Sequence, residues 1–338
     1  MLSSISRASA MSTSRNTLNA AAATRLSSIQ RHLSTTPSAR EGKIERLTVF
    51  GAGLMGAGIA QVGAQSGLKV VLSDVTDKAL ENGLNIIQKS LARVAKKKSP
   101  DDIEGFTSKI LKNIETTTDA GKAVEQSDLV IEAIIESIKV KRDLFGFLDS
   151  KAKSDCIFAT NTSSLSVTEI AESCSKERQE KFAGLHFFNP VPAMKLVEII
   201  RTSQTSTSTY EALKEVTLRM NKSPVTCNDT PGFIVNRLLV PYLLESIRMV
   251  ERGDATPEDI DTAMELGAGY PMGPFKLLDF VGLDTTSYIS QGWRDKAEAG
   301  QISKELVQPI ELLDKLVKEG KLGRKSGEGF YKVSHMIE

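Results

Sequence analysis

The chain has 338 residues, of which 40% are hydrophobic and 25% are charged. That length corresponds to roughly two domains of about 150 residues each, and the composition excludes a disordered or collagen-like chain. The 43 basic and 42 acidic side chains nearly cancel, which disfavours nucleic acid as the main partner because phosphate binding needs a basic excess.

The sequence predicts neither a membrane span nor a disulfide framework. Its most apolar run, 233–244, is interrupted by Asn236 and Arg237 and is shorter than the roughly 20 apolar residues that a spanning helix needs. The three cysteines are odd in number and lack CxxC spacing. We therefore expect reduced thiols, with neither disulfides nor a metal site.

Residues 1–40 differ in composition from the rest of the chain. They contain no Asp or Glu, but five arginines, ten serines and five threonines. An Arg- and Ser-rich segment without a continuous apolar stretch is typical of an organelle transit peptide, with a disordered tail as the alternative. We expect cleavage near residues 33–41, and removal of the five positive charges takes the net charge from +1 to −4.

A dinucleotide-binding signature opens the predicted fold. A β-branched and aromatic run at 47–50 is followed by Gly51-Ala-Gly53-Leu54-Met55-Gly56 and a predicted helix at 57–65. The first glycine makes the tight turn, the second lets the backbone approach a pyrophosphate, and the third allows close helix–strand packing. The N-terminus of the helix then offers N–H groups to the phosphates.

The second predicted strand, 69–74, specifies the dinucleotide. It ends at Asp74, 23 residues after Gly51, close to the roughly 20 expected for a carboxylate that binds the ribose hydroxyls. No arginine follows Asp74, so a 2′-phosphate would meet uncompensated repulsion. We predict NAD, and not NADP, as the cofactor.

A helical insertion follows this strand. Leu80, Leu84, Ile87, Leu91 and Val94 recur at spacings of four and three, which predicts one apolar helix face that ends at three lysines and a Ser-Pro break. Ser90 and Lys97 are seven residues apart and share one edge of this helix. From the residues alone, the lysines fit a solvated helix C-terminus, and the alternative is a docking point for a phosphorylated carrier.

Further apolar runs predict strands at 128–135, 156–159 and 182–187, with helical stretches between them. Alternating strands and helices indicate a doubly wound parallel sheet. His186 lies near the end of the last of these strands, and two prolines precede another apolar run at 196–200. A turn there would bring Glu198 toward His186, as a carboxylate that orients the imidazole of a general base.

The chain becomes helical after Pro231. Thr256-Pro257-Glu-Asp259 predicts a helix start, and Gly267 is predicted to end that helix. An earlier helix around 235–243 carries more apolar surface than one packing face needs. Asn236 in so apolar a helix is costly unless it is paired, which favours a role at a site.

Four segments in the same order resemble the L-3-hydroxyacyl-CoA dehydrogenase family: 51–56, Asn161-Thr-Ser-Ser-Leu165, His186-Phe-Phe-Asn-Pro190 and 229–239. The resemblance extends from about residue 43 to Tyr331 and, with the leader, is strongest to the mitochondrial short-chain members. It implies an α/β fold in which a Rossmann-type doubly wound sheet with a helical-hairpin insertion precedes an all-α C-terminal domain.

The resemblance also implies residue roles. His186 would be the general base with Glu198 as its partner, and Ser163 and Asn236 would hydrogen-bond the reacting oxygen of the substrate. The residues that it places on NAD are Gly51, Gly53, Leu54, Met55, Gly56, Asp74, Glu136, Lys141, Asn161 and Lys325. Ser90 and Lys97, together with Ser163, would contact a coenzyme A thioester, which reverses the solvated interpretation of the lysines.

The organisation implied in this way has three parts: a transit peptide at 1–40, an NAD-binding domain at 41–228, and a helical domain at 229–338 that closes over the substrate and forms a homodimer. The expected compartment is the mitochondrial matrix. Two rival functions remain: a sister dehydrogenase of a sugar acid or carnitine, and a redox-inactive NAD-binding structural protein.

Overall fold

The structure is a computed structural model that describes residues 43–332. All of these except Lys43 belong to the compact unit Ile44–Glu338. The predicted transit peptide at 1–40 lies outside the described residues. Within them, no helix combines the length and the apolar character needed to cross a lipid bilayer.

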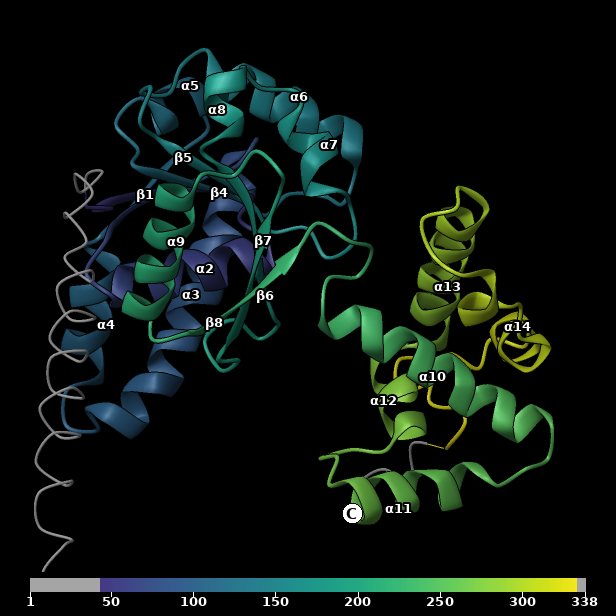
Figure 1. Cartoon of the computed structure of the whole chain (residues 1–338). Helices are drawn as coiled ribbons and strands as arrows, with labels where there is room; N and C mark the ends of the chain where they lie inside the picture. The colour runs from purple at the N-terminus through teal and green to yellow at the C-terminus, as the bar shows by residue number, and fades with distance from the viewer. Residues whose placement is uncertain (1–42, 333–338) are drawn as a thin grey trace, which may run out of the picture. The chain divides into compact units, whose positions relative to one another are not determined.

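The described residues contain one sheet of eight strands in the order β3-β2-β1-β4-β5-β6-β7-β8. Figure 1 shows strands β1 and β4 to β8 of this sheet with the helices around them. All neighbouring strands are parallel except the antiparallel pair β6–β7. The strands are β1 (Arg46–Phe50), β2 (Lys69–Ser73), β3 (Ile114–Thr117), β4 (Leu129–Glu132), β5 (Ile157–Thr160), β6 (Phe182–Phe187), β7 (Leu196–Arg201) and β8 (Ser223–Asn228). The first six follow the dinucleotide-binding order 3-2-1-4-5-6, so the predicted doubly wound sheet is confirmed.

The helices of the sheet-forming part cover both faces of the sheet. They are α2 (Leu54–Gln65), α3 (Asp77–Lys98), α4 (Ile103–Leu111), α5 (Ala120–Val124), α6 (Ile138–Asp149), α7 (Val167–Ala171), α8 (Lys176–Gln179) and α9 (Thr207–Arg219). Side chains of β4 alternate between the two cores: Leu129 and Ile131 pack with α2, α3 and α9, whereas Val130 packs with α5, α6 and α7. Alternation of this kind makes buried parallel strands apolar on both faces.

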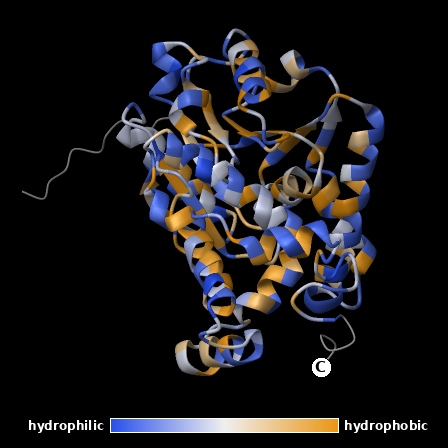
Figure 2. Cartoon of the chain, turned by 90° about the vertical axis from the view of Figure 1, so that its right-hand side faces the viewer, coloured by the Kyte–Doolittle hydropathy of each residue, from blue (hydrophilic) through white to orange (hydrophobic). Residues whose placement is uncertain are grey.

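After β8 the described chain is helical, as predicted. Its helices are α10 (Val235–Glu251), α11 (Pro257–Ala268), α12 (Pro274–Val281), α13 (Leu283–Glu298), the 3-10 turn η1 (Lys304–Val307) and α14 (Glu311–Lys318). They share a third hydrophobic core that includes Leu244, Phe275 and Trp293. Figure 2 shows hydrophobic residues concentrated along the strands and alternating with hydrophilic ones around the helices.

The helical insertion is confirmed as a hairpin, because α3 packs against α4. Thr76 caps the N-terminus of α3 by accepting a hydrogen bond from the Ala79 N–H, and three lysines occupy the last turn. Basic residues at that end are favoured by the helix dipole.

Several predicted boundaries were wrong. The dinucleotide helix begins at Leu54 and not at residue 57, because Gly53 at its N-cap already directs the chain into the helix. Helix α11 ends at Ala268, where Gly269 adopts a φ of 72°, so Gly269 and not Gly267 supplies the left-handed cap. Strand β4 ends at Glu132, and the residues as far as 135 form the turn that leads to Glu136.

Two strands were missed. β3 and β8 are the edges of the sheet, and both are partly exposed. Polar residues in β3 and Pro224 in β8 hide the hydrophobic pattern that identified the central strands, as is common at sheet edges.

Glycines 53 and 56 make different demands on the dinucleotide turn. A Cβ added at Gly56 would lie 1.7 Å from the Gly51 carbonyl oxygen, whereas a Cβ at Gly53 would have no atom within 4 Å. We expect Gly56→Ala to lower the free energy of unfolding by about 3 kcal/mol, at the upper end of the cost of overpacking. Gly53→Ala, the matched control, should cost less than about 1 kcal/mol. Denaturant unfolding of both variants measures this, and equal stabilities would contradict it.

Candidate active site

The antiparallel pair β6–β7 brings His186 and Glu198 together. The two residues are register partners, and the distance from His186 Nδ1 to Glu198 Oε2 is 2.7 Å. The prediction that a return strand brings Glu198 to the histidine is therefore confirmed. Both side chains are buried, so the contact is shielded from water.

The N-terminus of α10 holds the other oxygen of Glu198. The backbone N–H groups of Ile234 and Val235 donate to Glu198 Oε1 at 3.1 and 2.9 Å. Burial alone would raise the pKa of Glu198, but the hydrogen bonds from His186 and these two N–H groups outweigh burial and leave the pKa below its usual 4.5. An ionised Glu198 accepts a hydrogen bond from the protonated Nδ1 of His186, which leaves Nε2 as the basic nitrogen.

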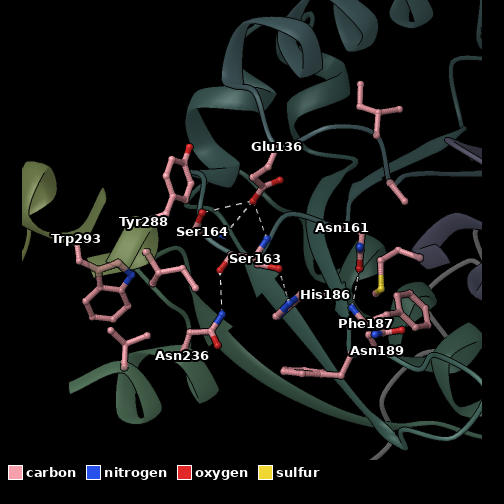
Figure 3. A pocket seen from close by; sticks show the side chains of 16 residues that line it. Glu136, Asn161, Ser163, Ser164, His186, Phe187, Asn189, Asn236, Tyr288 and Trp293 are labelled. Atoms are coloured by element: carbon pink, nitrogen blue, oxygen red, sulfur yellow. Dashed lines mark hydrogen bonds between the residues drawn. The ribbon is translucent and has the colours of Figure 1, made fainter. Parts of the chain in front are cut away.

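His186 Nε2 faces Ser163, with the hydroxyl oxygen 3.0 Å away. Ser163 lies on the loop after β5, and Figure 3 shows Glu136 beside this loop. Glu136 Oε1 accepts hydrogen bonds from the Thr162 hydroxyl at 2.6 Å, the Ser163 N–H at 3.0 Å and the Ser164 N–H at 3.3 Å. One carboxylate thus fixes the backbone that carries Ser163.

Two side chains from the helical part of the chain donate hydrogen bonds to carbonyl groups of the same loop. Asn236 of α10 donates from Nδ2 to the Ser163 carbonyl at 3.4 Å, and Lys296 of α13 donates to the Ser164 carbonyl. Burial lowers the pKa of Lys296 below its usual 10.5, although nearby carboxylates oppose that shift. Asn236 therefore has a hydrogen-bond partner, and its predicted contact with the substrate oxygen stays a prediction.

His186, Ser163 and Asn236 line a cavity of about 490 Å³ (Figure 3). Its polar side includes Glu136, Asn161, Ser163, Ser164, His186 and Asn189, and its apolar side includes Val240, Tyr288, Ile289 and Trp293 from α10 and α13. Met55 of the dinucleotide turn also lines it. The cavity therefore adjoins an imidazole, a hydroxyl group and the start of the helix that follows the glycine-rich turn.

Comparisons with known proteins decide the family. Residues 46–230 match the family profile described as "3-hydroxyacyl-CoA dehydrogenase, NAD binding domain", and residues 232–333 match "3-hydroxyacyl-CoA dehydrogenase, C-terminal domain". The chain belongs to the 3-hydroxyacyl-CoA dehydrogenase family. It is accordingly an oxidoreductase with an NAD-binding domain.

Similar proteins of this family come from animals and bacteria. The human protein named hydroxyacyl-coenzyme A dehydrogenase, mitochondrial, is 55% identical over 304 residues, which is 88% of this chain and 95% of that protein. A probable 3-hydroxyacyl-CoA dehydrogenase of Caenorhabditis elegans is 50% identical over 306 residues, 89% of this chain and 96% of the relative. The crystal structure of (S)-3-hydroxybutyryl-CoA dehydrogenase PaaH1 from Ralstonia eutropha is 37% identical, with a TM-score of 0.79, and the match covers 86% of this chain and 99% of that chain.

The glycine-rich turn fits the NAD that this family binds. Gly53 is the N-cap of α2 and makes no side-chain cap, and the space where its Cβ would lie is open. The first N–H groups of a helix lack intrahelical partners, so those of α2 suit a pyrophosphate. Asp74 lies beside the turn, where it accepts hydrogen bonds from the Ala52 and Val75 N–H groups, each at 2.7 Å.

Some residues assigned from the family resemblance lie outside the cavity lining. Lys141 is fully buried between Glu132 and Glu136, and Lys325 forms an ion pair with Asp284. Ser90 and Lys97 lie on α3, with Lys97 exposed, and neither lines the cavity. The predicted contacts of these four residues with cofactor or substrate remain predictions.

Asn161 lines the cavity, and its side-chain oxygen accepts a hydrogen bond from the Phe187 N–H at 2.8 Å. It therefore ties the loop after β5 to the end of β6.

The sequence interpretation missed several residues around the site. Glu132 was visible as the one acid inside an apolar strand, which is a signal for a buried and paired carboxylate. Lys296 and Trp293 gave no comparable signal, because their approach to the site depends on how α13 packs. Among residues 43–332, no three His, Cys, Asp or Glu side chains are grouped to hold a metal ion, and the three cysteines carry free thiols.

Glu198 should make stability depend on pH in a predictable direction. Because its pKa in the folded protein lies below 4.5, its contribution to the free energy of unfolding is full above that value and is lost as the pH falls through the folded pKa. We expect Glu198→Gln to lower the free energy of unfolding at pH 7 by about 1–3 kcal/mol, and the difference from wild type to shrink below about pH 4.

Denaturant unfolding at the two pH values tests this expectation. Glu245→Gln, which alters a half-exposed ion pair with Arg248 and Arg252, is the control and should have a small effect at both. A difference for Glu198→Gln that is independent of pH would contradict the assignment.

Proposed function

We propose that the chain oxidises (S)-3-hydroxyacyl-CoA to 3-oxoacyl-CoA with NAD in fatty-acid β-oxidation, with His186 as the general base assisted by Glu198. The observation that carries this proposal is the chain of contacts Glu198–His186–Ser163 on the wall of the cavity beside the glycine-rich turn. The names of the similar proteins support the choice of a coenzyme A thioester as substrate.

The residues divide the reaction between them. Bound NAD supplies the hydride acceptor for C3 of the substrate. His186 Nε2 takes the hydroxyl proton as the hydride leaves, and Glu198 stabilises the imidazolium that forms. Ser163 and Asn236 hydrogen-bond the substrate oxygen and, in the reverse direction, polarise the carbonyl that His186 protonates. The net products are 3-oxoacyl-CoA, NADH and one proton.

NAD would lie along the glycine-rich turn. We assign its binding to Gly51, Gly53, Leu54, Met55, Gly56 and Asp74, with Glu136, Asn161 and Lys325 toward its other parts. Lys141, whose side chain has no exposed surface, would act on NAD through Glu136. Coenzyme A would lie on α3 at Ser90 and Lys97. We further propose the division into an NAD-binding domain at 41–228 and a substrate-closing helical domain at 229–338.

The wider setting is part of the proposal. We propose that residues 1–40 are a transit peptide that directs the enzyme to the mitochondrial matrix, which the acid-free composition of the segment supports. We also propose a homodimer formed through the helical domain. Large hydrophobic side chains on its helices support this, because Leu238, Leu266, Phe280 and Val281 are exposed and would be covered by a second copy.

The reaction is tested with acetoacetyl-CoA and NADH by following NADH consumption. We expect the wild-type protein to be active and His186→Gln to lose about 10²–10⁴ in kcat, while NADH binding by titration is retained. A sugar acid or carnitine oxidised in place of the thioester would favour the sister dehydrogenase, and no turnover of any of these would favour a redox-inactive protein. Full activity of His186→Gln would exclude His186 as the base.

The coenzyme A contact is tested on Lys97. We expect Lys97→Ala to raise the KM for acetoacetyl-CoA about fivefold, since one exposed ion pair contributes up to about 1 kcal/mol. The KM for acetoacetyl-pantetheine, which lacks the nucleotide, should not change. Lys78→Ala, at the other end of the same helix, is the control. An unchanged KM for both substrates would return the lysines to a solvated helix end.

A further inference from the structure

A fully buried ion pair lies behind the cavity. The side chains of Glu132 and Lys141 have no exposed surface, and Lys141 Nζ lies 2.5 Å from Glu132 Oε1. Glu132 is also bonded by the Ile134 N–H at 2.8 Å and by the Thr160 hydroxyl at 2.6 Å. These contacts join the ends of β4 and β5 to the first turn of α6.

Stability of the fold does not explain such a pair. Removing two charges from water costs several kcal/mol per ion, and buried pairs replaced by apolar residues of similar volume often leave stability unchanged or higher. The surrounding core offers many apolar neighbours, including Val130, Phe145 and Phe158. A charged pair at this position therefore points to a task other than holding the core together.

The pair connects directly to the site. Lys141 Nζ also lies 3.2 Å from Glu136 Oε2, and the other oxygen of Glu136 holds the backbone of Ser163 and Ser164. Burial would raise the pKa of Glu136, but the charge of Lys141, with the hydrogen bonds from Thr162 and Ser163, keeps the pKa below its usual value. Lys141 therefore keeps Glu136 ionised as an acceptor, and Glu132 keeps Lys141 in place.

We propose that the Glu132–Lys141 pair is a positioning device for Ser163, acting through Glu136. Because Lys141 Nζ is shared between two carboxylates and Glu132 is fixed by three donors, the Glu136 carboxylate is aimed at one side only, toward the loop. This sets the Ser163 hydroxyl 3.0 Å from His186 Nε2. Lys141 thus acts on the loop, and it does not touch the substrate. The inference rests on the proposed function for the role of Ser163.

The decisive variant is E132Q/K141M. It removes the two fully buried charges together, so neither of them is left unpaired in the core. Glu136 then loses its counter-ion, and the Ser163 loop loses its fixed acceptor. We expect kcat with acetoacetyl-CoA and NADH to fall about 10²-fold, the cost of a misplacement of about 1 Å. The KM for acetoacetyl-CoA should change little, and the acidic limb of the kcat profile should move to higher pH as Glu136 becomes easier to protonate.

A second buried ion pair of the same part of the chain supplies the matched control. Arg178 and Asp149 lie 2.9 Å apart, with Arg178 buried, and neither lines the cavity. D149N/R178M should lower stability without changing kcat or its pH profile. An equal loss of kcat in both double variants would mean that the Glu132–Lys141 pair acts only through stability, and would overturn the proposal.

A readout independent of turnover separates this inference from the proposed reaction. The chain has three histidines, so the imidazole of His186 is resolvable by NMR. The chemical shift of its Nε2 reports the hydrogen bond with Ser163 and should change in E132Q/K141M but not in D149N/R178M. An inactive wild type would refute the proposed reaction, whereas unchanged shifts and unchanged kcat in folded E132Q/K141M would refute the positioning role.

Thr160→Val covers the case in which the double variant does not fold. It deletes only the hydroxyl that donates to Glu132 Oε2, with nearly the same volume. We expect a smaller fall in kcat in the same direction and a smaller shift change at His186. Wild-type values for both would overturn the proposal.

Discussion

Placement of the His186 imidazole depends on one carboxylate that binds two parts of the chain. Glu198 accepts hydrogen bonds from the His186 imidazole on the neighbouring strand and from two backbone N–H groups at the start of α10. The helix N-terminus favours negative charge, and the anion in turn determines which imidazole nitrogen is basic. Glu198 also ties the helical part to the sheet. One carboxylate thus both orients the imidazole and holds the start of α10.

A second carboxylate plays the corresponding part for Ser163. Glu136 holds the loop by its N–H groups from the sheet side, while Asn236 and Lys296 hold it by its carbonyl groups from the helical side. Neither set of contacts would define the loop alone, because loops without regular structure have few backbone hydrogen bonds of their own. The loop that carries Ser163 is thereby bonded to both parts of the chain.

The central strands, the dinucleotide turn and the pairing of His186 with Glu198 could be predicted because each depends on local patterns: apolar runs, glycine spacing and a two-strand turn. The end of α11 could not, since both Gly267 and Gly269 are able to cap a helix and only the backbone angle chooses between them. The burial of Lys141 also could not be predicted from the sequence. A lysine on an amphipathic helix is normally solvated, and its ion pair with Glu132 forms only when α6 packs on the sheet.

The hydrogen bonds that hold the Ser163 loop from two sides make the position of Ser163 depend on both parts of the chain. Without α10 and α13 the two loop carbonyl groups would lose their donors, and only Glu136 would hold the loop beside His186. The position of Ser163 therefore depends on contacts from the sheet side and from the helices together. Under the proposed function, proton transfer at His186 would therefore depend on the helical part of the chain as well as on the sheet.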